Sequence, residues 1–222
     1  KANALLANIP QKELPQLMAI VGDALWFGDD AAFATLVDQH GCASPDDIEA
    51  RLNAATTLRA QLKHYSGAMF HYEGEWYWGI DRLHYLEARL AELSVDRQPD
   101  QPYITECPEV SVVGVDNASD LTLEFFPSLR SPYTSIVFDE TIDLARMAGV
   151  NLVMRPVLPM VMRGVPVTRE KGMYIFSDTA REARRRGVAY GKMYDPIGNP
   201  VRRCYSLYPW AVLQGKGNEL LS

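Results

Sequence analysis

Residues 121 to 158 constrain the fold more than any other part of the chain, because they read as a strand, a helix and a second strand. Alternating apolar residues at 121–125 predict a half-buried strand. Ser131-Pro132 predicts the helix start, since serine is a favoured N-cap and proline fits the first helical position. Gly149 is a fitting helix stop, and the apolar run at 151–158 predicts the second strand. A unit of about 40 residues with this pattern predicts an α/β fold.

Two further helices are expected after this unit. The first runs from about residue 168 to Arg186 and ends at Gly187, where a left-handed residue is needed. The arginines in its last turns complement the helix dipole, and Glu182 is spaced to pair with Arg186. Residues 197–213 predict the second helix, whose length its two prolines are expected to limit.

The first part of the chain reads as helices followed by a hairpin. Apolar spacings of three and four predict short helices within residues 14–37. A serine and a proline followed by two acids start a helix over 45–64. Aromatic residues on both sides of a Glu-Gly turn predict a β-hairpin over 68–78. Asp81 is then the expected N-cap of an amphipathic helix that ends near Leu93.

Residues 94–120 separate these two parts and are interpreted as a linker. They contain three prolines, several acids and little periodicity, although Val110 to Val113 fits a short strand. The expected organisation is therefore a first piece at 1–93, a linker at 94–120 and a second piece at 121–222.

Composition excludes two classes of partner. The chain has 222 residues and a net charge of -6, which does not suit a surface that binds nucleic acid. The longest apolar stretch, residues 150–162, is broken by Arg155 and two prolines, so we expect no membrane span. The expected partner is a small-molecule substrate.

Three widely spaced cysteines, Cys42, Cys107 and Cys204, offer no C-x-x-C pair and no disulfide framework. This number and spacing of cysteines favours a reducing compartment, so we expect a cytoplasmic protein. The chain begins at Lys1 rather than Met, so we expect that the native start is missing. A signal peptide before Lys1 therefore remains an alternative. Four histidines show no metal-ligand spacing and no G-x-S-x-G occurs, so neither a metal site nor a Ser-His-Asp hydrolase is expected.

The segment 125–135, Phe-Phe-Pro-Ser-Leu-Arg-Ser-Pro-Tyr-Thr-Ser, resembles the first strand and helix start of 2-hydroxychromene-2-carboxylate isomerases and kappa-class glutathione transferases. Pro166 and residues 171–174 and 178–187 resemble the stretch that follows in the isomerases. These families belong to the DsbA-like branch of thioredoxin folds. The resemblance implies that Ser131 meets the sulfur of glutathione, in the place where DsbA-type oxidoreductases keep a cysteine.

The segment 74–83, Gly-Glu-Trp-Tyr-Trp-Gly-Ile-Asp-Arg-Leu, resembles the last hairpin and last helix of the same families, and the helices before it resemble their inserted helical domain. The resemblance implies that Asp81 holds the γ-glutamyl end of glutathione. The alternative is that Asp81 only caps the helix that follows it. Trp78 is either a ligand platform or a hairpin packing residue. Ala68 stands where relatives have a cis-proline that offers its backbone to glutathione, which weakens this half of the site.

The two matching pieces occur in reverse order and cover most of residues 12–93 and 121–214. This order is expected if the chain is the middle of a tandem-domain protein whose outer ends are absent. The fold class expected from the resemblance is α/β and thioredoxin-like of the DsbA type, with a helical insertion and its halves in permuted order. The pieces complete each other within one chain, across a homodimer by swapped pairing, or with segments beyond the chain.

The chemistry of Ser131 follows from its place at a helix start. The unpaired N–H groups and partial positive charge there favour the thiolate form of a bound thiol, and a serine O–H can hydrogen-bond that thiolate. Ser131 is the candidate catalytic residue, and Pro132 and Tyr133 beside it are candidate residues for binding glutathione or substrate. Lys171 is expected to meet a glutathione carboxylate. The alternative is a purely structural role, in which Ser131 only caps the helix.

Three functions follow. The leading one is a glutathione-dependent isomerase or transferase, in which the glutathione thiolate, as co-substrate, adds to an unsaturated aromatic acid or another electrophile. The alternative is a non-catalytic, degenerate thioredoxin-fold module for binding or assembly. Dithiol oxidoreductase activity of the DsbA kind is third and disfavoured, because no cysteine stands at the helix start.

Overall fold

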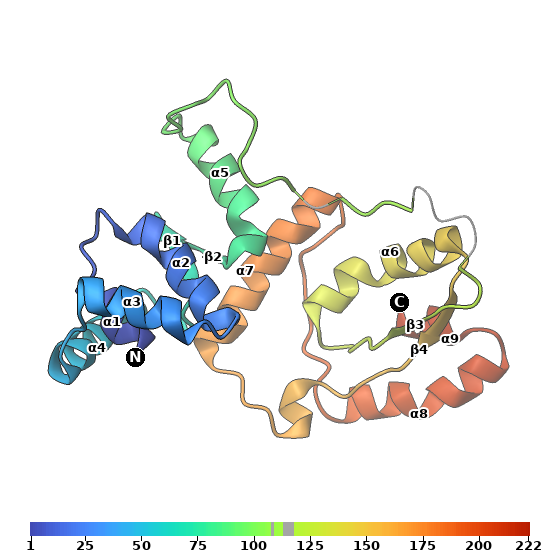
Figure 1. Ribbon diagram of the computed structural model, residues 1–222. Coiled ribbons are helices and arrows are strands. Elements are labelled where there is room, and N and C mark those ends of the chain that lie inside the picture. Colours follow the sequence, from blue (N-terminus) through green and yellow to red (C-terminus); the bar gives the residue numbers. More distant parts are fainter. Residues whose placement is uncertain (108, 113–117) are drawn as a thin grey trace. The chain divides into compact units, whose positions relative to one another are not determined.

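The structure is a computed structural model that describes residues 1–107, 109–112 and 118–222 (Figure 1). It is a mixed α/β structure in which helices predominate and the sheets are small, so the α/β class is confirmed. The chain divides into two compact units, Lys1–Lys63 and His64–Ser222. None of the helices in the described part is long and apolar enough to cross a membrane.

The first unit contains four helices: α1 (Ala2–Asn8), α2 (Leu14–Trp26), α3 (Asp30–His40) and α4 (Pro45–Gln61). Its core consists of the buried side chains Leu5, Ile9, Val21 and Leu36. The predicted helices are confirmed, while α1 was not predicted, although its Leu5 is fully buried in the core. The serine before α4 is its N-cap, as expected.

The second unit begins with the predicted hairpin, in which β1 (Met69–Tyr72) pairs antiparallel with β2 (Glu75–Trp78) and Phe70 lies opposite Tyr77. The two turn residues have positive φ angles, 44° at Glu73 and 85° at Gly74. This conformation matches the twist of two-residue hairpin turns, and it explains why a glycine follows the glutamate.

The predicted cap of the next helix is wrong. A 3-10 turn, η1 (Ile80–Arg82), separates the hairpin from α5 (Leu83–Glu92), so Arg82 occupies the N-cap position and no side chain caps α5. Asp81 lies inside the 3-10 turn and its side chain is exposed. The sequence pattern placed the helix start one residue early because a 3-10 turn and an α-helix begin with similar residues.

The linker predicted at 94–120 has no helix or strand in its described residues. Val110 to Val112 do not form the expected strand, and Val113 lies outside the described residues. Glu87 on α5 accepts hydrogen bonds from the backbone N–H groups of Ile104 and Thr105, at 2.8 and 2.7 Å. The first half of the linker is therefore attached to α5.

The strand, helix and strand predicted first are confirmed as β3 (Thr122–Phe125), α6 (Pro132–Ala148) and β4 (Asn151–Met154). The two strands are parallel, with Leu123 opposite Leu152. Gly149 ends α6 in the left-handed conformation, with φ of 68°. Among the described residues β3 and β4 form one two-stranded sheet and β1 and β2 form another, so the strands do not join into one continuous sheet.

The chain ends with a 3-10 turn, η2 (Met160–Arg163), and three helices, α7 (Arg169–Arg186), α8 (Asn199–Leu213) and α9 (Gly217–Leu221). Helix α7 and its glycine stop are confirmed. Pro200 lies in the first turn of α8, where its missing N–H costs little, but the expected limit at Pro209 is wrong because α8 continues through it. That proline gives up only one backbone hydrogen bond.

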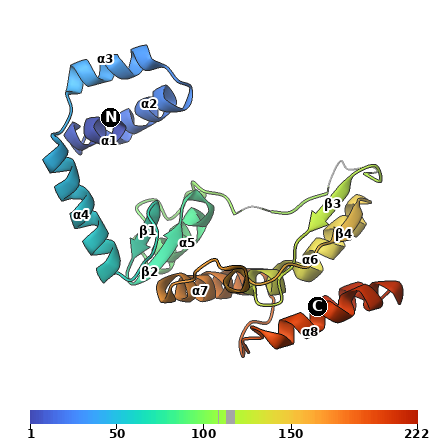
Figure 2. The same cartoon turned by 90° about the horizontal axis from the view of Figure 1, so that it is seen from below.

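The hairpin, η1 and α5 lie beside α7 in both views (Figures 1 and 2). The hairpin and α5 therefore belong to the same compact unit as β3 to α9. The boundary between the two units lies between Lys63 and His64. The expected organisation had placed the hairpin and α5 with the first helices instead.

Candidate functional site

Ser131 is the N-cap of α6, as predicted. Its Oγ accepts a hydrogen bond from the backbone N–H of Thr134 at 3.3 Å, and Pro132 follows in the first turn. Ser131 donates no side-chain hydrogen bond to any described residue, and no acidic residue lies in the first turn of α6. The hydroxyl proton and the positive end of this helix are thus both available to an anion.

The loop that leads into Ser131 is held from two sides. The Tyr205 hydroxyl of α8 accepts a hydrogen bond from the backbone N–H of Leu129 at 3.1 Å and donates one to the carbonyl of Val157 at 2.9 Å. Arg130 forms a bidentate pair with Asp195, at 2.7 and 2.8 Å. These contacts fix the position of Ser131 through residues that the sequence analysis did not identify.

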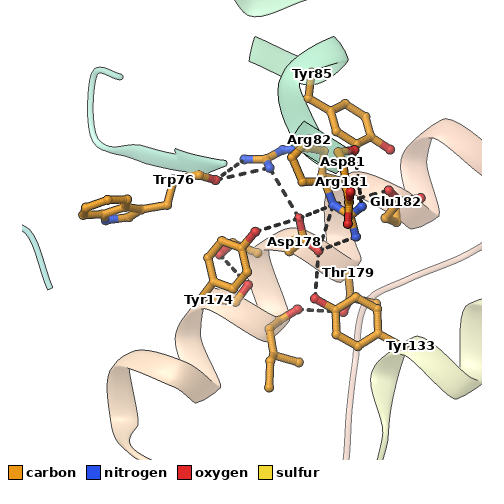
Figure 3. Close-up of polar contacts among 12 residues, drawn as sticks. Trp76, Asp81, Arg82, Tyr85, Tyr133, Tyr174, Asp178, Thr179, Arg181 and Glu182 are labelled. Atoms are coloured by element: carbon orange, nitrogen blue, oxygen red, sulfur yellow. Dashed lines mark hydrogen bonds and ion pairs between the residues drawn. The ribbon is translucent and has the colours of Figure 1, made fainter. Parts of the chain in front are cut away.

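A buried carboxylate lies under the start of α6 (Figure 3). Asp178 of α7 has a side chain that is 1% exposed. It accepts hydrogen bonds from Arg82 Nε and Nη2 at 3.0 Å each, and from the Tyr133 hydroxyl at 2.7 Å. The Tyr174 hydroxyl, one turn earlier on α7, lies 3.3 Å from the same carboxylate. The hairpin–α5 segment, α6 and α7 are therefore joined at one residue.

This arrangement raises the pKa values of Tyr133 and Arg82. Burial raises the pKa of the Tyr133 hydroxyl, and the charge of Asp178 and the hydrogen bond to it raise it further. Burial opposes the charge of Arg82, but the hydrogen bond and charge of Asp178 outweigh this effect and raise the pKa of its guanidinium. Tyr133 is therefore a hydrogen-bond donor that positions α6, and not a group that exchanges protons near neutral pH.

Glu182, one turn further along α7, contacts three arginines. Its carboxylate lies 3.6 Å from Arg82, 3.3 Å from Arg185 and 3.4 Å from Arg186. The pairing of Glu182 with Arg186 is confirmed, and Arg186 also bonds Glu140 of α6. Arg186 therefore adds a second contact between α6 and α7, beyond the one at Asp178.

Two predicted ligand-binding residues lie on either side of Tyr65. The ammonium group of Lys171 is 5.9 Å from the centre of the Tyr65 ring, and the Trp78 ring meets the same ring edge-on at 5.9 Å. Tyr174 contacts both Tyr65 and Trp78, at 6.4 and 5.7 Å. We call Tyr65, Trp78, Lys171 and Tyr174 the aromatic group. Because Tyr174 also bonds Asp178, the aromatic group adjoins the buried carboxylate.

The predicted site is therefore brought together in part. Tyr133 bonds Asp178, and Lys171 and Trp78 belong to the aromatic group. Asp81 is adjacent in sequence to Arg82, but its exposed side chain makes no hydrogen bond or ion pair with a described residue. Ser131 and Pro132 lie at the start of the helix that carries Tyr133 and make no contact with the aromatic group among the described interactions.

Sequence reasoning missed the residues at the centre: Arg82, Tyr174, Asp178 and Glu182. One signal was present, because the last three are spaced by four residues and thus share one face of α7. The buried residues of this helix include all three. An acid at a core-facing position predicts a buried partner, which here is Arg82, 96 positions away.

The described residues contain no group of three or more histidines, cysteines and acids that could hold a metal ion. A scan against protein-family models, a search of curated proteins and a search of solved structures each found no match to the chain.

Proposed function

We propose that this protein is a glutathione-dependent isomerase or transferase that acts on an unsaturated aromatic acid or another electrophilic small molecule. The proposal includes the finer fold, a thioredoxin-like domain of the DsbA type with a helical insertion and its halves in permuted order. One observation carries it: at the start of α6 the Ser131 hydroxyl donates no hydrogen bond to a described residue, and no acidic residue stands in the first turn of the helix.

Ser131 would hold the thiolate of glutathione. A thiol at this position meets the positive end of α6 and the O–H of Ser131, and both interactions stabilise its ionised form. The thiolate then adds to an electrophilic carbon, with the electron pair of the substrate double bond moving away from that carbon. In an isomerase, rotation and elimination of the same thiolate would return glutathione unchanged.

The remaining predicted residues would bind the two molecules. The Lys171 ammonium lies over the Tyr65 ring, which also contacts the Trp78 ring, so a cation and an aromatic surface are adjacent. In the leading proposal Lys171 meets a carboxylate of glutathione and the exposed Asp81 meets its ammonium. Pro132 and Tyr133 hold the helix start in place.

The test is a calorimetric titration of glutathione into the wild-type chain and into a Ser131→Ala variant. We expect saturable heat with the wild type and at least about tenfold weaker binding by the variant, because the hydrogen bond to the thiolate is lost. Ser44→Ala removes the matching cap of α4 and is the control, for which binding should not change. An absence of heat with the wild type removes the proposal, and equal binding by Ser131→Ala removes the role of Ser131.

A second candidate is a non-catalytic module for binding or assembly, which forms a homodimer or exchanges half-domains with a second copy. The separate two-stranded sheets favour it, because each leaves strand edges without a partner strand among the described residues. Ala68, the counterpart of the cis-proline, has a φ of 54° instead, and the described residues contain no cis peptide bond. Turnover of an aromatic isomerase substrate would exclude this candidate, and light scattering would measure the oligomeric state.

Dithiol oxidoreductase activity has the least support. All three cysteines, Cys42, Cys107 and Cys204, are free thiols, and none stands at the start of α6. A cytoplasmic location is a further part of the proposal, because the three widely spaced cysteines offer no disulfide framework. Reduction of insulin above the buffer rate would show that this view of the cysteines is wrong.

A further inference from the structure

A pocket with a cavity volume of about 380 Å³ lies between α6 and the C-terminal end of α7. The α6 wall consists of Ser135, Ile136, Asp139 and Glu140, which share one face of the helix. None of the six predicted site residues lines it. The inference drawn from this pocket therefore does not depend on glutathione binding.

Two arginines form the cationic side of the pocket. Arg185 donates to the Tyr85 hydroxyl and to Glu182, and Arg186 donates to Glu182 and Glu140. A guanidinium carries five N–H groups, and these contacts use two of them on each arginine. Both side chains are thus held in place by α5, α6 and α7 while retaining donors for a further oxygen ligand.

Asp139 forms the anionic side. It is exposed, and among the described residues it makes no hydrogen bond or ion pair, in contrast to Glu140, which bonds Arg186. It lies one helical turn after Ser135, whose hydroxyl donates to the carbonyl of Pro132 and can still accept a hydrogen bond. The pocket therefore has acceptors for a cationic donor on its α6 wall.

The apolar part of the pocket is formed by Ile136, which is 5% exposed, and by Val188 just beyond α7. A ligand with only a carboxylate would meet the Asp139 and Glu140 carboxylates as well as the arginines. A ligand with only an ammonium group would meet two guanidinium groups. A ligand that carries both charges, with an aliphatic part, satisfies all three surfaces.

We propose that this pocket binds a small zwitterion, an α-amino acid with a branched aliphatic side chain. Its carboxylate lies on Arg185 and Arg186, its ammonium group on Asp139, and its side chain against Ile136 and Val188. The cavity is at the lower end of the range found for ligand pockets, which suits a ligand of this size.

The test compares three probes of matched shape by calorimetric titration into the full chain: L-leucine, 4-methylpentanoate, which lacks the ammonium group, and 3-methylbutan-1-amine, which lacks the carboxylate. We expect L-leucine to bind at least about tenfold more tightly than either analogue. Equal binding of L-leucine and one analogue, or no saturable binding of L-leucine, would overturn the proposal.

Asp139→Asn separates the proposed role from a general effect on the fold. Since Asp139 has no partner among the described residues, the variant should fold normally, which circular dichroism checks. L-leucine affinity should fall to that of 4-methylpentanoate, whose own binding should not weaken. The matched control is Asp143→Asn, one turn further along α6 and paired with Arg146, which should bind L-leucine as the wild type does. Unchanged L-leucine binding by Asp139→Asn would contradict the proposal.

Discussion

The starts of α4 and α6 have the same local motif and different surroundings. Both begin with a serine and a proline, and in both the serine Oγ accepts the N–H of the third following residue, at 3.1 Å for Ser44 and 3.3 Å for Ser131. At α4, however, the Ser44 hydroxyl donates to Asp47 at 2.7 Å and two acids occupy the first turn. At α6 no acid stands in the first turn, and the nearby Asp178 carboxylate is bonded to Tyr133 and Arg82 instead of to Ser131.

Burial separates the two helices further. Helix α4 has no buried residue, whereas α6 buries Ile136, Phe138 and Ala145 and ties its Tyr133 to Asp178. The same motif thus gives a self-contained surface helix in one unit and an anchored helix start with an open hydroxyl in the other. The comparison shows that a Ser-Pro cap predicts a helix, while its capacity to bind an anion depends on the neighbouring residues.

The largest expected effect comes from removing the anchor of α6. Asp178→Ala removes a buried carboxylate and leaves the half-buried Arg82 guanidinium without its main partner, so we expect a loss of about 3 kcal/mol in the free energy of unfolding. Urea denaturation monitored by tryptophan fluorescence measures this loss. The experiment uses a Trp26→Phe background, in which the remaining tryptophans all lie in the second unit.

Asp195→Ala is the control, because it breaks a pair with Arg130 in which the aspartate side chain is 51% exposed. Its expected cost is at most about 1 kcal/mol. Equal losses in the two variants would mean that Asp178 does not anchor the start of α6.

The next effect concerns the second helical residue of each motif. Tyr133→Phe removes one hydrogen bond to a buried carboxylate and should cost about 1.5–3 kcal/mol. The counterpart in α4 is Asp46, where substitution by Ala removes only a favourable charge near the helix end, about 0.3–1 kcal/mol. The same urea titrations measure both losses in the free energy of unfolding. A loss for Tyr133→Phe no larger than that for Asp46→Ala would contradict the difference in burial between the two helix starts.

A third variant converts α6 into the α4 arrangement. Thr134→Asp places an acid where α4 has Asp47, so the Ser131 hydroxyl gains an internal acceptor. Helix stability should change by no more than about 1 kcal/mol, while glutathione affinity should fall at least about tenfold, because the added carboxylate repels a thiolate. Thr134→Asn is the neutral control, and calorimetry measures both. Unchanged affinity in Thr134→Asp would show that the open helix end does not bind the thiolate.

The smallest effect is a dependence of stability on pH in the second unit. His84 is buried and neither ring nitrogen has a hydrogen-bond partner among the described residues, and burial lowers its pKa despite the opposing charge of Glu182. The unfolded chain therefore binds a proton at higher pH than the native state does, so stability should fall as pH drops below about 6.5 and be unaffected above it.

His84→Phe keeps the ring and removes the titrating group, so its urea midpoint should depend less on pH between pH 5 and 7 than that of the wild type. Equal pH dependence in the two proteins would show that another group is responsible.

Local features were predictable because their causes lie within a few residues. The caps at Ser44 and Ser131 depend on hydrogen bonds that span three residues, and the stop at Gly149 depends on its own backbone angles. The hairpin followed from its aromatic strands and turn. The failures were also local, where a 3-10 turn replaced the cap at Asp81 and where α8 tolerated Pro209.

The candidate site was predictable only in part, since its centre depends on contacts between distant segments. Nothing near Arg82 in the sequence indicates that its partner is Asp178, and nothing near Tyr65 indicates Lys171. Such pairs form because buried charges need partners and because helix α7 presents one face to both the hairpin and α6.

The sequence alone determined that Ser131 starts a helix, since an N-cap serine, a proline at the first position and an apolar stripe all favour that outcome locally. The tertiary structure decided that this helix start is anchored by Tyr133 on Asp178. The reason is that capping is satisfied by the backbone of the same helix, whereas anchoring needs a carboxylate from α7 and a guanidinium from the segment before α5.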